Sequence, residues 1–375
     1  MPNKKLILHL SLIDGVGPTT VQNILKNSNS DLSRDLYRLS TYDWMHYFGM
    51  TEKVAEKIVT GLADQKILET ELQLIEKHNI RISTIIDNDY PTLLQQIHMP
   101  PPVLYYRGGD FLSNIALAIV GSRASNTYGH KVVTTLVPDL VASGMTIVSG
   151  GALGIDALAH DITLKHGGRT IAVLGSGLLK EYPVSNKKLF KSIVEHDGLL
   201  VSIFPLLAEP VPGNFPARNR VIAGLSNGCL VVQAAQKSGA LITAHYALEQ
   251  GREVFAVPGP IDDPLSIGCH SLIQQGAKLV MSATDIIQEV GGVYPVVRDV
   301  QTTLYEAQQL NKQTFSEAQT KIIAACKKAA SLDDILNATG LELPVVQSEL
   351  FNMQLEGWVE QDFTGMWVTT RLFNI

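Results

Sequence analysis

ALAIVGSR (Ala116–Arg123) is an almost wholly apolar run that stops at glycine, and a helical pattern follows it to about Ser143. A second short apolar run, Met145–Ser149, ends at Gly150-Gly151 and leads into another helical pattern. Two such runs in succession are typical of βαβ units, whose parallel strands are buried on both faces. In these sheets a ligand binds beyond the carboxyl ends of the strands, where the first amides of the next helix point outward. The stretch therefore predicts both a fold and the place of a binding site.

The same alternation continues to about residue 289. Helical patterns separate five further strand-like runs: Thr170–Leu174, Gly198–Ile203, Gly228–Gln233, Glu253–Val257 and Lys278–Val280. Two more strand-like runs, Ile82–Ile86 and Val103–Tyr106, come before Ala116. The pattern predicts an α/β fold, a doubly wound Rossmann-like parallel sheet with its core over 115–289, in a domain of residues 71–292.

Residues 1–70 predict a small N-terminal helical domain. Leu12–Leu25 contains a Gly-x-Gly turn between helical patterns, and a fainter copy follows at Phe48–Ile58. This arrangement resembles a helix-hairpin-helix (SAM-like) domain, whose turn amides can hold a nucleic-acid phosphate. The alternative, which we favour, is that these hairpins only pack against one another.

The C-terminal part predicts a linker over 293–314 and a winged-helix domain over 315–375, with three helices and a β-hairpin. Winged helices commonly bind DNA, but this one contains four Lys or Arg against eight Asp or Glu. The expected recognition helix, Pro344–Gly357, has two glutamates and no basic residue. Because these charges repel phosphate, we expect this domain to contact a protein partner.

The composition predicts a globular protein of two or three domains. The chain has 375 residues and a formal net charge of −6, so a polyanion would need a local basic patch. Cys229, Cys269 and Cys326 lie far apart, which argues against a zinc site or a disulfide framework and fits a reducing cytoplasm. The apolar run after Lys4-Lys5 is too short for a signal peptide, and we expect neither export nor a membrane span.

The strongest site signal is a segment rich in basic residues and free of acidic ones. No Asp or Glu lies between Glu209 and Glu249, whereas Arg218, Arg220 and Lys237 do. Arginine presents a planar fork that suits phosphate and can also stack on a base. Because the two arginines are only two residues apart, we leave open that one of them pairs inside the protein.

Lys237-Ser238-Gly239 follows a predicted strand and begins a helix, so the helix dipole adds to the lysine charge. For Ser238, a plain N-cap is the simpler interpretation. The glycine-rich segments supply only part of a dinucleotide fingerprint, and the chain has no P-loop motif. We therefore expect no cofactor and no metal.

Taken together, the motifs resemble the DNA-processing protein A (DprA/Smf) family. The matching segments are Val120–Arg123, Ser149–His160, Phe215–Ser226, Lys237–Ala244 and Pro258-Gly259, with Asp89–Pro91, Tyr182-Pro183 and the C-terminal module. The resemblance implies a homodimeric, single-stranded DNA-binding protein of natural transformation, and from the cysteine pattern we expect it in the cytoplasm. Such a protein protects incoming strands and helps to load a RecA-type recombinase.

The resemblance also implies a strand-binding pocket. Its residues would be Ser122, Arg123, Gly150, Gly151, Phe215, Arg218, Asn219, Arg220, Lys237, Ser238 and Gly239. Phe215 is the candidate platform for a base, with a buried core ring as the equally weighted alternative. We expect Arg123, Arg218, Arg220 and Lys237 to meet at one mouth.

The rival interpretation is an enzyme. The sheet also resembles the Lonely Guy phosphoribohydrolases, which cleave nucleoside monophosphates beside a Pro-Gly-Gly-x-Gly-Thr loop. Here Pro258-Gly259 is followed by Pro260, and Gln233 stands where the DprA/Smf family usually has glutamate. Asp156 and His160 are spaced as a possible acid and base on one helix face, but a local hydrogen bond between them is the favoured reading. We therefore expect no catalytic activity.

Overall fold

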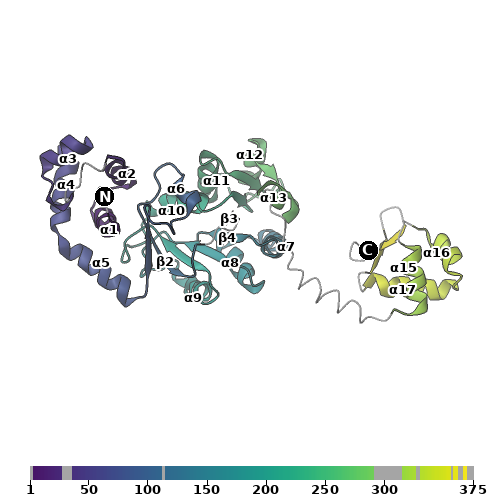
Figure 1. Cartoon of the computed structure of the whole chain (residues 1–375). Helices are drawn as coiled ribbons and strands as arrows, with labels where there is room; N and C mark the ends of the chain where they lie inside the picture. Colours follow the sequence, from purple (N-terminus) through teal and green to yellow (C-terminus); the bar gives the residue numbers. More distant parts are fainter. Residues whose placement is uncertain are drawn as a thin grey trace. The chain divides into compact units, whose positions relative to one another are not determined.

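The computed structural model describes residues 3–27, 36–111, 115–290, 315–326, 330–355, 358–361 and 366–369. The chain divides into two compact units, Met1–Tyr294 and Pro295–Ile375 (Figure 1). The predicted linker over 293–314 lies outside the described residues. Within the described ranges, no helix is long and apolar enough to cross a bilayer.

The first unit contains a nine-stranded, mostly parallel sheet. Its strands, in chain order, are β1 (Arg81–Thr84), β2 (Val103–Gly108), β3 (Ala116–Val120), β4 (Thr146–Ser149), β5 (Thr170–Val173), β6 (Leu199–Ser202), β7 (Gly228–Val231), β8 (Glu253–Ala256) and β9 (Lys278–Leu279). The order across the sheet is β1-β2-β6-β5-β4-β3-β7-β8-β9. The predicted doubly wound α/β fold is confirmed, and each predicted strand is present to within three residues at either end.

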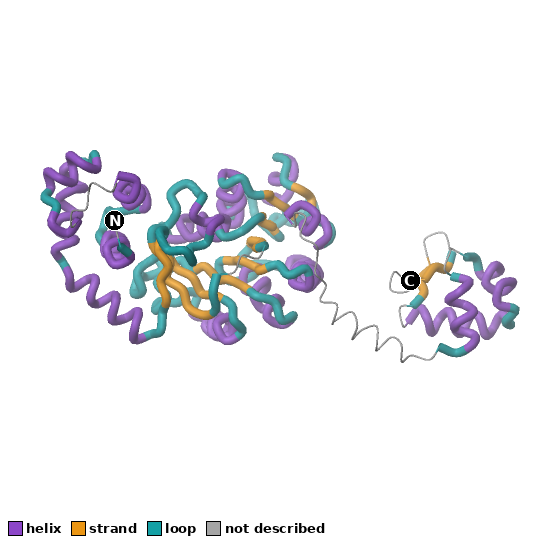
Figure 2. The backbone as a smooth tube through the Cα atoms, in the orientation of Figure 1, coloured by secondary structure: helices purple, strands orange, loops and turns teal. Residues whose placement is uncertain are grey.

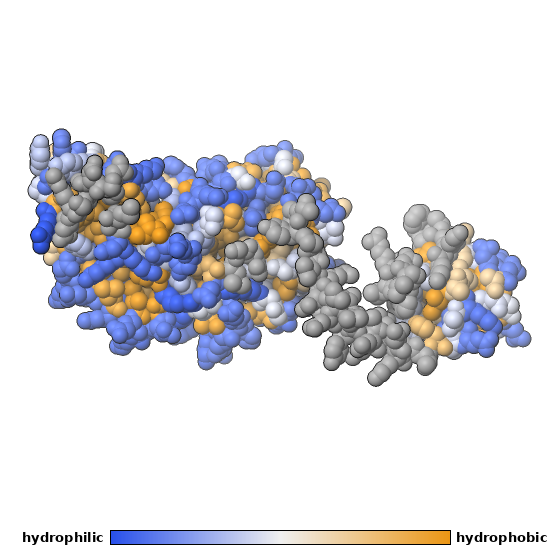
Figure 3. Space-filling model, in the orientation of Figure 1, coloured by the Kyte–Doolittle hydropathy of each residue, from blue (hydrophilic) through white to orange (hydrophobic). Residues whose placement is uncertain are grey.

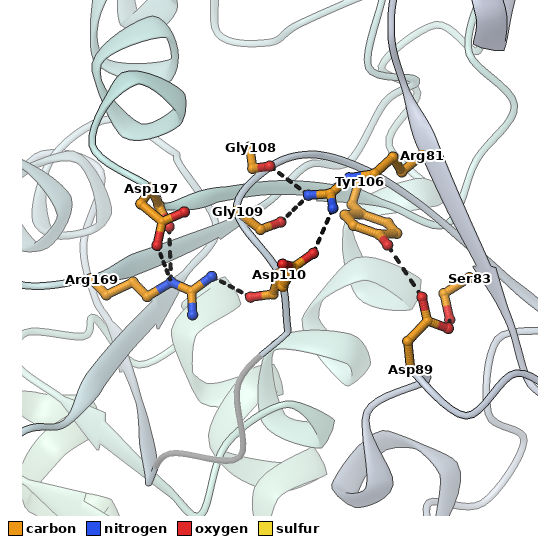
Figure 4. A network of polar contacts seen from close by, with 9 residues as sticks. All are labelled: Arg81, Ser83, Asp89, Tyr106, Gly108, Gly109, Asp110, Arg169 and Asp197. Carbon is orange, nitrogen blue, oxygen red and sulfur yellow. Dashed lines mark hydrogen bonds and ion pairs between the residues drawn. The ribbon is translucent and has the colours of Figure 1, made fainter.

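The sheet is wider than the predicted core over 115–289. β2 pairs antiparallel with β6, and β1 pairs antiparallel with β2, so both strands extend the parallel sheet at one edge. A polar network holds this edge, in which Arg81 binds Asp110 and the carbonyl of Gly109, and Arg169 binds Asp197 (Figure 4). Arg169 directly precedes β5, and Asp197 lies two residues before β6, so the network lies at the amino ends of these parallel strands.

Helices cover both faces of the sheet because side chains alternate along each buried strand (Figure 2). In β3, Ala118 and Val120 join the core under one set of helices, and Leu117 and Ile119 the core under another. The first set is α6 (Thr92–Gln95), α10 (Asn214–Gly224), α11 (Gly239–Glu249) and α12 (Ile267–Gln274); the second is α7 (Thr127–Ala142), α8 (Ile155–Lys165) and α13 (Ala283–Val290).

The N-terminal segment is helical and shares a core with the sheet. Its elements are α1 (Lys4–Leu12), α2 (Pro18–Asn27), the short 3-10 helix η1 (Leu36–Arg38), α3 (Thr41–Phe48), α4 (Glu52–Ala63) and α5 (Gln65–Lys77). Their apolar residues join one cluster with Tyr105 of β2 and Phe190 of α9 (Lys187–Glu195), which follows the 3-10 helix η2 (Val184–Asn186). On the face shown in Figure 3, hydrophilic residues surround patches of hydrophobic ones.

The second unit contains α15 (Glu317–Ala325), α16 (Leu332–Thr339) and α17 (Leu343–Leu355), followed by β10 (Val359–Gln361) and β11 (Trp367–Thr369). The two strands form an antiparallel pair. Ser316 and Ser331 each make a capping box at the start of a helix. A small separate core contains Ile322, Ile335 and Leu350.

Candidate functional site

The site lies where the order of the sheet reverses. From β3 the chain proceeds through α7 to β4 on one side, whereas β7 leads through α11 to β8 on the other. A cavity of about 490 Å³ opens beside the carboxyl ends of β3 and β7. Such a switch point is where doubly wound sheets bind ligands. Eight of the predicted site residues line the cavity: Ser122, Arg123, Phe215, Arg218, Asn219, Lys237, Ser238 and Gly239.

Phe215 is half-buried in the first turn of α10. Its ring lies under two guanidinium groups, with the central carbon of Arg123 5.4 Å and that of Arg218 5.8 Å from the ring centroid. The ring packs closely on Gly175, where an added Cβ would lie 2.7 Å from it. The core therefore fixes the Phe215 ring, which is one of the two alternatives predicted for it. The ring also borders the cavity, the position that the other alternative, a platform for a base, requires.

Arg123 and Lys237 are the accessible cations of the cavity. Both side chains are exposed, and neither forms an ion pair within the described part of the chain. Arg123 directly follows Ser122 after β3, and Lys237 precedes the N-cap of α11. Two unneutralised charges thus face one cavity from two different strand ends.

Arg218 is an internal residue, with 4% of its surface exposed. It donates hydrogen bonds to the carbonyls of Gly150 and Val173 and to Oδ1 of Asn219, the last two over 2.6 and 3.0 Å. Burial lowers the pKa of its guanidinium to about 10, although the nearby Asp156 carboxylate raises it. Of the two arginines in α10, Arg218 is the one that pairs inside the protein.

Arg220 does not line the cavity, so the expectation that four cations meet at one mouth is wrong for this residue. Two residues along an α-helix turn a side chain by about 200°, which places Arg220 opposite Arg218. The Arg220 side chain is half-buried, and this burial lowers the pKa of its guanidinium.

The two predicted glycines allow close packing behind the cavity. A Cβ on Gly150 would lie 2.5 Å from an Arg218 nitrogen, and one on Gly151 2.7 Å from the Phe190 ring. Gly151 also has φ +64°, a conformation that favours glycine. Gly150 lines a small adjoining pocket of about 40 Å³, and neither glycine lines the main cavity.

Asp156 and His160 do not bond to each other, so the expected local hydrogen bond is wrong. Asp156 accepts the backbone N–H groups of Gly150 and Ala152, over 3.2 and 3.3 Å. Burial raises the pKa of its carboxyl, while the Arg218 charge and the two amides lower it. Because the Asp156 oxygens are held this way, the carboxylate acts as a support for the β4–α8 turn.

His160 is fully buried and lies outside the cavity lining. Its Nδ1 lies 2.6 Å from the hydroxyl of Thr170, which itself donates to the carbonyl of Ile147. The hydroxyl therefore accepts from Nδ1–H, and Nε2 is the unprotonated nitrogen, which has no partner. Burial lowers the pKa of His160 to about 3, so the ring is neutral at physiological pH.

The start of α11 completes the site. The Ser238 hydroxyl accepts the N–H of Ala240 over 3.2 Å, which confirms the predicted N-cap. Asn219 donates to the carbonyl of Gly239 over 3.2 Å and thereby links α10 to α11. The free amides of this helix start add partial positive charge beside Lys237.

The family of the chain follows from comparison with known proteins. A family model described as DNA recombination-mediator protein A matches residues 81–291, more than half of the chain. The chain belongs to the DNA recombination-mediator protein A family. The match contains the whole parallel sheet and the cavity.

Named relatives agree with this family. Protein Smf from Synechocystis sp. is 35% identical over 94% of this chain and 95% of its own length. DNA processing protein DprA from Streptococcus pneumoniae is 46% identical over 55% of this chain and 73% of its own. A crystal structure of the S. pneumoniae protein superimposes with a TM-score of 0.67 at 37% identity, covering 77% of this chain and 98% of the other.

A second solved structure concerns DNA processing protein A from Helicobacter pylori and its mode of single-stranded DNA binding. It has a TM-score of 0.52 and 30% identity, and it covers 57% of this chain and 98% of the other. Both structural relatives are thus members of the family that the sequence motifs indicated.

Two residues that contact predicted site residues were not themselves predicted as part of the site. The Tyr182 ring lies 6.2 Å from that of Phe215, and Asn186 donates to the carbonyls of Gly151 and Ala152. Tyr182 belongs to the loop after β5, another carboxyl strand end. Its place after a strand end was the sequence signal that could have identified Tyr182.

No group of metal-binding side chains was found among the residues that the structure describes. Cys229, Cys269 and Cys326 are all buried and unpaired. Burial raises the pKa of the Cys229 thiol to about 12, so it is protonated at neutral pH.

Proposed function

We propose that this chain binds single-stranded DNA in the cavity at the carboxyl ends of β3 and β7. In this proposal it protects incoming strands during natural transformation and helps to load a RecA-type recombinase on them. The relatives named DNA processing protein, and the H. pylori structure concerned with single-stranded DNA binding, support the DNA ligand. The recombinase partner rests on the family resemblance.

One observation carries the proposal. Arg123 and Lys237, both exposed and without an ion pair among the described residues, line one cavity with the half-buried ring of Phe215, and Arg123 lies over that ring. Single strands need cations that follow the phosphates and an aromatic face for the bases. The cavity offers both, although the whole chain has a net charge of −6.

We propose a binding role without catalysis. His160 is buried outside the cavity, and the Asp156 carboxylate is engaged by backbone amides. Gln233, which stands where a glutamate is usual, exchanges hydrogen bonds with Asn126 at the start of α7. Asp156, His160 and Gln233 therefore provide no free acid–base pair in the cavity, which disfavours the phosphoribohydrolase alternative.

The remaining parts of the proposal concern assembly. We assign α15–α17 and the β10–β11 pair to a winged helix that contacts a protein, because its acidic surplus opposes phosphate binding. We assign α1 and α2, joined through Gly15–Gly17, to a helix-hairpin-helix with a packing role. A homodimer is part of the proposal on the family resemblance alone.

A salt-titrated binding experiment tests the proposed function. We expect poly-dT to bind and duplex DNA of the same length to bind more weakly. Arg123→Ala and Lys237→Ala should each weaken binding and lower the salt slope by about 0.7 per lost phosphate contact. The matched control is Lys165→Ala, since Lys165 ends α8 before the amino end of β5 and lines neither the main cavity nor the small pocket beside it. Unchanged slopes in both site variants would refute the pocket, and release of free base from nucleotides would favour the enzyme.

A further inference from the structure

A second cavity continues from the proposed DNA site. Its volume is about 450 Å³, and its lining includes Tyr182, Lys187, Arg107, Glu181, Lys180 and Glu209. Tyr182 also lines the small pocket that borders Arg123 and Phe215, and those two residues line the main cavity. Shared lining residues thus connect the three spaces in sequence, from Lys237 through Phe215 to Lys187.

Tyr182 offers an aromatic face at this junction. The side chain is 44% exposed, and its ring centroid lies 6.2 Å from that of Phe215, with the planes inclined by 54°. Two rings in this arrangement do not stack on one another, so each can receive a separate base. Exposed Val184, at 73%, adds apolar surface beside Tyr182.

Lys187 supplies the free charge of the second cavity. The two carboxylates in its lining are engaged, since Glu181 binds Arg107 and Glu209 binds Lys180. Three basic and two acidic side chains leave a surplus of one positive charge in this set. Lys187 is exposed and has no ion pair within the described ranges, so that surplus is accessible.

The same segment is fixed to the main site. Lys187 is the first residue of α9, and the side chain of Asn186 before it does not cap the helix. Instead Asn186 donates to the carbonyls of Gly151 and Ala152 over 2.9 and 3.2 Å, in the turn after β4. The start of α9 therefore has a fixed position relative to the first cavity.

We propose that Tyr182 and Lys187 form a second nucleotide subsite, in which the Tyr182 ring stacks on the base next to the one on Phe215 and Lys187 contacts the phosphate. This inference rests on the proposed function, and it gives the strand a path between Lys237 and Lys187. The ligand is a continuing single strand; a mononucleotide fills only one of the two subsites.

Oligo-dT strands of increasing length test this subsite with the full chain. Tyr182→Ala should weaken binding of strands long enough to fill both subsites by roughly five-fold or more, and leave the shortest bound strands unaffected. Tyr182→Phe should retain wild-type affinity. Lys187→Ala should lower the salt slope by about 0.7 on long strands only. Lys165→Ala is the matched lysine control.

Photocrosslinking provides a direct readout. Strands with iododeoxyuridine at single positions should crosslink Tyr182 and Phe215 from different, neighbouring positions. One outcome is that wild-type protein binds long strands, Arg123→Ala lowers this affinity, and Tyr182→Ala and Lys187→Ala change neither affinity nor salt slope. In that case the second subsite is wrong and the proposed function stands. If wild-type protein binds no single strand, the proposed function itself fails. A crosslink to Phe215 alone on long strands also overturns the subsite.

Discussion

The guanidinium of Arg123 lies over the ring of Phe215, with its central carbon 5.4 Å from the ring centroid. Arg123 is exposed, whereas Arg218, which also borders the ring, is buried. A cation over an exposed aromatic face contributes about 0.5–1 kcal/mol. Because this attraction is small, a base that stacks on Phe215 in the proposed function would displace Arg123 at little cost, and Arg123 would then be free to contact the phosphate.

Phe215→Ala should therefore weaken binding of single-stranded DNA by about 1–3 kcal/mol, the contribution of one stacked base. Phe215→Tyr should keep most of the affinity because it retains the ring. Fluorescence anisotropy with oligo-dT measures both variants, and circular dichroism checks that each is folded. Equal affinity of the alanine variant and wild type would show that the ring belongs only to the core.

Gly175→Ala should displace the Phe215 ring, since the new Cβ would lie 2.7 Å from it. We expect weaker binding of oligo-dT with no loss of a charge, so the salt slope should remain that of wild type. Gly213→Ala is the matched control, because Gly213 precedes α10 with φ −64° and nothing lies within 4 Å of the added Cβ. Equal losses in the two variants would contradict a specific effect on the ring.

The parallel strands were predictable because each is short, apolar and followed by a helix. The edge pairing of β1 and β2 was not, since antiparallel pairing of Tyr105 with Ser202 joins residues far apart in the chain. Such a contact depends on the tertiary fold, and no local pattern in either segment encodes it.

The site was predictable in place but not in the role of each arginine. Ser122 and Lys237, which follow the carboxyl ends of β3 and β7, both line the cavity, as the strand ends predicted. Arg218 and Arg220 look equivalent in a list of charges, yet the helix turns them to opposite faces, and only the sheet beneath decides which one is buried. Applying the helical period to Asn214–Gly224 would have separated them.

Arg218→Ala should destabilise the fold by about 3–5 kcal/mol, because it leaves the buried Asp156 carboxylate without its nearby charge. Arg123→Ala, at an exposed position, should change the free energy of unfolding by about 0.5 kcal/mol or less. Urea denaturation followed by circular dichroism compares the two. An Arg218→Ala protein of wild-type stability that has lost DNA affinity would instead make Arg218 a direct contact.

The buried His160 predicts a loss of stability in mild acid. Its pKa is about 3 in the folded protein and about 6.5 when the ring is free in water. Between these values the unfolded chain binds a proton that the folded protein excludes, so the free energy of unfolding falls as pH falls. This single ring contributes a slope of up to about 1.4 kcal/mol per pH unit below pH 6.5.

His160→Gln tests this, since glutamine can donate to Thr170 and does not titrate. Urea denaturation at about pH 7 and about pH 5 should show a smaller loss of stability in the variant than in wild type, by roughly 1–2 kcal/mol. Burial also lowers the pKa of His9, so His9 lowers stability in acid as well. Because His9 is present in both proteins, the difference between their pH profiles reports His160 alone. Parallel pH profiles would mean that His160 binds its proton equally well in the folded and unfolded chains, and the unpartnered Nε2 would then have to be accessible to a proton.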